Sequence, residues 1–163
     1  MVVAVLYGSF RALGGGEAVP AEDYRGLLLR LVEYTSTRAT ELSDALAAPA
    51  PAHGRDAAAD SGGRVTDPLV ETAASARKKL GGYLQQLNRV ESSAGGEERD
   101  RLEGSRTLLA AGVEDLAWAC RLIEGGTYRD NTGLQRAVAE LREHATQCLE
   151  AVGRLLPAEA AHP

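Results

Sequence analysis

The chain has 163 residues, of which 44% are hydrophobic and 25% charged, a composition typical of one globular domain. Its net charge of -5 at pH 7 disfavours broad binding to nucleic acids or anionic membranes, since both need a positive protein surface. The two cysteines, Cys120 and Cys148, form no Cys-x-x-Cys pair, so we expect reduced thiols in a cytoplasmic protein. No apolar run is long enough to span a membrane.

The amino-terminal segment carries apolar residues at helical spacing, three and four positions apart. These residues are Val3, Leu6, Phe10 and Leu13. Gly14 to Gly16 follow and interrupt the pattern. The sequence therefore predicts a short helix over residues 2–13.

Four longer segments have the spacing of amphipathic helices, at about 20–46, 68–90, 97–124 and 133–156. Along each, apolar residues recur in alternating steps of three and four, which is the seam of a left-handed helical bundle. Asp67 is expected to cap the second segment, and Thr132 the fourth, with Gln135 at capping-box spacing. The double glycine Gly81-Gly82 predicts a bend or a close helix contact.

The connections complete the predicted architecture. Residues 48–66 are rich in Ala, Pro, Gly and Asp and are expected to form a flexible loop, while residues 158–163 are expected to be a disordered tail. The other two links are short, which makes consecutive helices antiparallel. We predict one all-α domain over residues 1–163, an antiparallel up-down four-helix bundle with a short extra N-terminal helix.

The third helix carries a second apolar stripe on its outer side. Its members include Leu108, Ala111, Trp118 and Leu122, whereas the corresponding outer positions of the other helices are mostly polar or charged. A helix that is apolar on two sides is usually covered on both. We consider three partners that would cover this stripe: the segment with Leu6 and Phe10, a second copy of the chain, or another protein.

Polar residues within the apolar seams suggest a second kind of site. Arg38 and Arg106 each replace an apolar residue. Both could extend their charged heads to solvent. Alternatively, a polar cavity around Arg38 could bind a small anion, with Tyr34, Tyr83, Arg106 and His144 as further candidate ligands.

Sequence signatures of catalysis are weak. We find no phosphate-binding glycine loop, no Gly-x-Ser-x-Gly motif and no zinc spacing, and we expect no metal and no cofactor. Cys148 lies one helical turn from His144, but it faces the core, where a thiol behaves as a small apolar group. Antiparallel pairing displaces Cys120 from Cys148 by about 18 Å along the helices, too far for a disulfide.

The sequence alone leaves two functions open. The first is a non-enzymatic interaction or regulatory module that self-associates through the outer face of the third helix, with itself or another protein as partner. The alternative is a small-molecule (anion) binding bundle or enzyme with a polar core site around Arg38. A metal-binding bundle is a weaker third reading, because the four predicted long helices contain no Glu-x-x-His motif.

Overall fold

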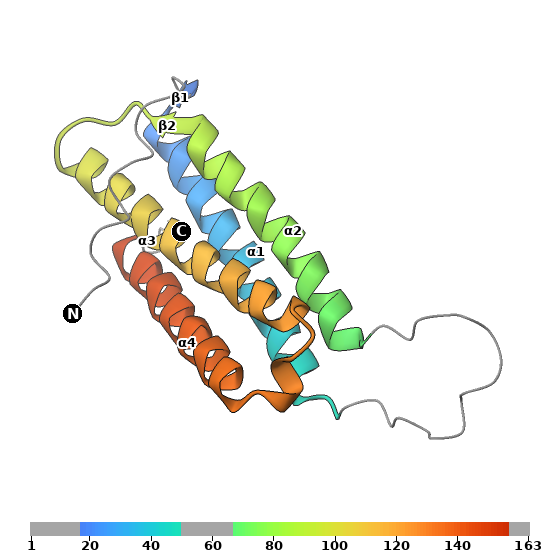
Figure 1. Cartoon of the computed structure of the whole chain (residues 1–163). Helices are drawn as coiled ribbons and strands as arrows, with labels where there is room; N and C mark the ends of the chain where they lie inside the picture. Colours follow the sequence, from blue (N-terminus) through green and yellow to red (C-terminus); the bar gives the residue numbers. More distant parts are fainter. Residues whose placement is uncertain (1–16, 50–66, 157–163) are drawn as a thin grey trace, which may run out of the picture.

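A computed structural model describes residues 17–49 and 67–156. It contains four long helices, α1 (Ala21–Ala47), α2 (Pro68–Arg89), α3 (Gly96–Glu124) and α4 (Thr132–Leu155), which lie side by side (Figure 1). The all-α class and the four predicted helices are confirmed, and every boundary agrees within one residue. The predicted N-terminal helix, most of the loop (50–66) and the tail lie outside the described residues.

Local capping explains where the helices begin. The Asp67 side chain accepts a hydrogen bond from the backbone N–H of Leu69 at 3.0 Å, as predicted. At α4 the cap is Asn131 rather than Thr132, and its side chain accepts from the N–H of Leu134 at 3.1 Å. The sequence places two good caps side by side, and the short helix η1 (Tyr128–Asp130) positions the first of them.

A short parallel β pair was not predicted. β1 (Glu17–Val19) precedes α1, and β2 (Val90–Ser92) directly follows α2. The Ser93 backbone N–H extends the pairing by donating to the Val19 carbonyl at 2.8 Å. The pair joins residues more than 70 positions apart, and three-residue strands are too short to show an alternating pattern. Val90, expected as the last residue of the second helix, belongs to this pair instead.

Specific polar contacts tie α2 to its neighbours. At one end, Arg129 of η1 donates two hydrogen bonds to Asp67 at 2.7 and 3.1 Å. Farther along α2, Arg77 makes a bidentate ion pair with Glu124 of α3. At the other end, the Arg106 Nε of α3 donates to the Leu87 carbonyl at 2.9 Å. Residue numbers therefore rise along α2 while those of its α3 partners fall.

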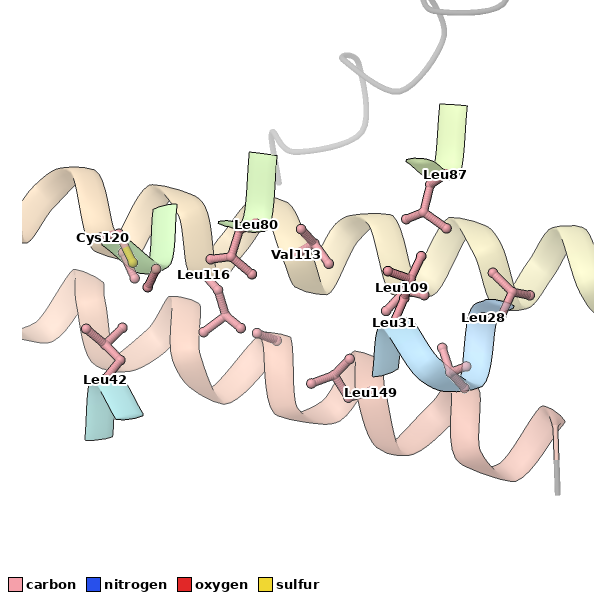
Figure 2. Packing of buried hydrophobic residues seen from close by; sticks show 14 of the residues in the cluster. Leu28, Leu31, Leu42, Leu80, Leu87, Leu109, Val113, Leu116, Cys120 and Leu149 are labelled. Carbon is pink, nitrogen blue, oxygen red and sulfur yellow. The ribbon is translucent and has the colours of Figure 1, made fainter. Parts of the chain in front are cut away.

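The core is a single apolar cluster between the helices, to which all four contribute leucines (Figure 2). Most of the predicted seam positions are buried. The exposed seam position is Leu155 at the end of α4, which is 38% exposed, while Leu149, Val152 and Leu156 are buried there. A straight helix with 3.6 residues per turn drifts away from a 3.5-residue repeat, so the buried stripe moves by one position at the end of α4.

Candidate functional site

Trp118 lies on the outer side of α3 with 54% of its surface exposed. The Arg121 guanidinium carbon stands 5.0 Å from the ring centre, which is a cation–π contact. The other predicted members of the stripe, Leu108, Ala111 and Leu122, are half-buried. Leu108 and Leu122 pack against the core cluster, so Trp118 is the strongly exposed member of the predicted face.

The central position of α3 explains why its sequence is apolar over so wide an arc. This helix contacts α1, α2 and α4. Besides its two seam columns it buries a third column of small residues, Ser105, Gly112 and Ala119. Because three neighbours surround α3, half-buried leucines at its margins need no further partner. Trp118 is the apolar residue on this helix that its neighbours leave substantially uncovered.

The structure gives each residue of the site predicted around Arg38 contacts of its own. The Arg38 side chain is largely buried and forms an ion pair with Glu41 at 2.7 Å, while its Nε has no hydrogen-bond partner among the described residues. The hydroxyl of Thr35, a buried polar residue on the same helix, donates to the Leu31 carbonyl at 2.6 Å. Tyr34 and Tyr83 form a tilted aromatic pair with ring centres 6.0 Å apart.

The two remaining candidates, Arg106 and His144, have structural partners elsewhere. Arg106 donates to the Leu87 carbonyl and to the Asn88 side chain, so it caps the carboxyl end of α2. His144 of α4 contacts the Asp115 carboxylate of α3, at 2.5 Å from Nδ1. Neither contact involves Arg38, and the predicted anion-binding role of these residues stays a prediction.

Asp115, His144 and Cys148 stand in the order of a cysteine–histidine–carboxylate triad. The His144 Nε2 lies 3.9 Å from the Cys148 Sγ. The thiol is only 5% exposed, however, and its burial, followed by the negative charge of Asp115, raises its pKa above the ordinary value. A nucleophilic cysteine needs the opposite shift. Burial of Cys148 therefore favours its neutral thiol over the thiolate.

Cys120 is also a buried free thiol, as predicted. Burial is the largest cause that raises its pKa to about 11, and the nearby Glu124 carboxylate adds to the effect. Within residues 17–49 and 67–156, no group of three or more His, Cys, Asp or Glu side chains is placed to hold a metal ion.

The described residues also form an open cleft between α1 and α2, next to the β pair. Its volume is about 470 Å³. It is lined by Glu17, Leu27, Arg30, Leu31, Tyr34, Gln86, Arg89 and Val90. Of the five residues predicted for ligand binding, Tyr34 alone lines it. The sequence signal that could have located the cleft is the pair of stripes 27-30-31-34 and 86-89-90, in which arginines adjoin apolar residues.

Comparisons with protein-family models, with curated proteins and with solved structures give no match for this chain. Among the helices that the structure describes, none combines the length and the apolar character needed to cross a bilayer.

Proposed function

We propose that the chain is a non-enzymatic interaction module, an antiparallel up-down four-helix bundle that self-associates through the outer face of α3. The observation that carries this proposal is the exposure of Trp118, 54%, on a helix whose other large apolar residues are covered. A large aromatic ring left in water is a typical centre of a protein interface, where burial of its surface stabilises association by about 2–3 kcal/mol.

The charges around Trp118 favour a second copy of the chain as the partner. If two α3 helices approach antiparallel with their Trp118 rings side by side, Asp115 of one copy, which also contacts His144 of its own chain, lies opposite Arg121 of the other. Glu114 then faces Leu122, close to the same arginine. A two-fold interface repeats each such contact twice, so a face with acidic groups on one side of the aromatic centre and a basic group on the other is self-complementary.

Mass measurement by light scattering tests this proposal. We expect the wild-type chain to have twice the monomer mass and Trp118→Glu to have the monomer mass with the same helix content. Leu155→Glu is the matched control, because Leu155 is also an exposed apolar residue but lies on α4. It should keep the dimer mass.

Two results would overturn self-association. A monomeric wild-type chain at high concentration is the first. The second is a lower melting temperature in both Trp118→Glu and Phe10→Glu with no change of mass, because the amino-terminal segment with Leu6 and Phe10 would then be the cover. In the cell we expect this module in the cytoplasm, with no nucleic acid or membrane as partner.

A further inference from the structure

The cleft between α1 and α2 has two walls and two ends. One wall is α1, with Leu27, Arg30, Leu31 and Tyr34 on one face of the helix; the other is α2, with Gln86 and Arg89. Glu17 of β1 and Val90 of β2 close one end. Tyr34 stands at the other end, against Tyr83. Its volume of about 470 Å³ falls in the range of small-molecule sites.

Two arginines of the cleft form no ion pair within the described part of the chain. Arg30 and Arg89 are exposed, and neither makes an ion pair or hydrogen bond to another described residue. In contrast, Arg77, Arg106 and Arg129 are each held by acidic side chains. A guanidinium offers paired N–H donors with the geometry that a carboxylate, sulfonate or phosphate accepts.

Apolar surface lies beside these charges. Leu31, 1% exposed, belongs to the core, while Leu27 and Val90 are half-buried. The Tyr34 ring is 48% exposed and is supported from one side by Tyr83, so it offers an aromatic surface next to the cleft. The carboxylate of Glu17 disfavours a second negative group at the β end.

From this juxtaposition we infer that the cleft binds an amphipathic organic anion, a molecule with a planar or aliphatic apolar body and one acidic group. The acidic group lies between Arg30 and Arg89, and the apolar body lies along Leu27, Val90 and the Tyr34 ring. This inference does not depend on self-association, because the cleft residues and Trp118 lie on different helices.

The test uses two fluorescent probes with the same aromatic body, the anion 1-anilinonaphthalene-8-sulfonate and the uncharged N-phenyl-1-naphthylamine. We expect the folded full chain to bind the anion at one site and more tightly than the neutral probe. Arg30→Met and Arg89→Met should each weaken anion binding about tenfold, with little change for the neutral probe. Tyr34→Ala should weaken both.

Control variants separate the cleft from other surfaces. Arg136→Met removes an exposed arginine on α4 and should bind the anion like the wild type. Trp118→Glu should also bind it normally, even if it abolishes the dimer. The inference is overturned if the folded chain does not bind the anion, if both cleft-arginine variants bind it with wild-type affinity, or if Trp118→Glu alone removes binding.

Discussion

The α3–α4 contact and the α1–α2 contact are built in different ways. Between α3 and α4 the backbones approach so closely that a Cβ added at Gly112 would lie 3.2 Å from both the Ala145 carbonyl oxygen and the Cys148 Cβ. Between α1 and α2, by contrast, two tyrosine rings stand with centres 6.0 Å apart next to a cleft of about 470 Å³. Small residues line the first interface, whereas the second contains an aromatic pair and a cleft.

Polar groups show the same contrast. Two buried polar atoms without a partner in the described part of the chain, the Tyr24 hydroxyl and the Arg38 Nε, both belong to α1. Buried polar atoms are nearly always hydrogen-bonded in folded proteins, so each such atom lowers stability. The contact between α3 and α4 is therefore closely packed, whereas α1 carries buried polar atoms that its described neighbours leave without a partner.

The largest expected effect tests the close approach of α3 to α4. Gly112→Leu should lower the free energy of unfolding by about 3 kcal/mol or more, because the new side chain would meet backbone atoms that cannot move without separating the helices. Urea denaturation at neutral pH measures this change.

Gly104→Leu is the matched control for that substitution. Gly104 lies in the same helix, and a Cβ added there meets nothing within 4 Å. Leucine also favours a helix over glycine, so this variant should be as stable as the wild type or slightly more stable. If both variants lower the free energy of unfolding equally, the contact at Gly112 is no tighter than the rest of α3.

The second-largest expected effect is a loss of stability at high pH, which tests whether the Cys120 thiol of α3 is shielded from water. The pKa of Cys120 is about 11 in the folded chain, against an ordinary value of 9.0. The unfolded thiol therefore loses its proton first as the pH rises. Stability contributed by the neutral thiol is fully present below pH 9 and is lost as the pH rises through 11, by on the order of 2 kcal/mol.

Urea denaturation between pH 8 and 11 measures this loss. Cys120→Ala should show a weaker decline over the same range, whatever its stability at neutral pH. Part of the decline in stability should remain in Cys120→Ala, because the pKa of Cys148 is also raised. Identical declines in Cys120→Ala and wild type would mean that the Cys120 thiol is already accessible to water in the folded chain.

Much of the fold could be predicted from the sequence because helical periodicity is a local signal. The alternating spacing of apolar residues located all four helices and most of the core, and Asp67 was recognised as a cap from its position before Pro68. The same periodicity predicts that no disulfide joins Cys120 to Cys148, and both are free thiols. Each of these conclusions needed only residues within one helix or one hairpin.

The features that escaped prediction depend on contacts between distant segments. Gly81-Gly82 predicts a bend or a close helix contact. The close contact is wrong, because a Cβ at either position meets nothing within 4 Å, and the bend stays a prediction. The close approach occurs at Gly112, where a signal was present: Ser105, Gly112 and Ala119 repeat at seven-residue spacing. The stripes 27-30-31-34 and 86-89-90 form the cleft only together, and the pattern of neither helix specifies how α1 meets α2.

The smallest expected effect concerns α1 and its buried Tyr24 hydroxyl. The Tyr24 hydroxyl is fully buried without a partner among the described residues, and burial is the main cause that raises its pKa to about 12. Tyr24→Phe keeps the ring in the core and removes an unsatisfied polar atom. It should raise the free energy of unfolding at pH 7 by about 1 kcal/mol, as urea denaturation would measure.

The same variant should resist alkali better than the wild type. The folded pKa of Tyr24 lies above its ordinary value of 10.0, so the wild type loses stability as the pH rises from 10 through 12, a loss that phenylalanine cannot show. Tyr83→Phe is the matched control, because Tyr83 is only half-buried, and it should leave stability nearly unchanged. If Tyr24→Phe instead lowers the free energy of unfolding, the hydroxyl does form a stabilising hydrogen bond. The buried Tyr24 hydroxyl of α1 would then have a hydrogen-bond partner, and α1–α2 would differ from α3–α4 in packing alone.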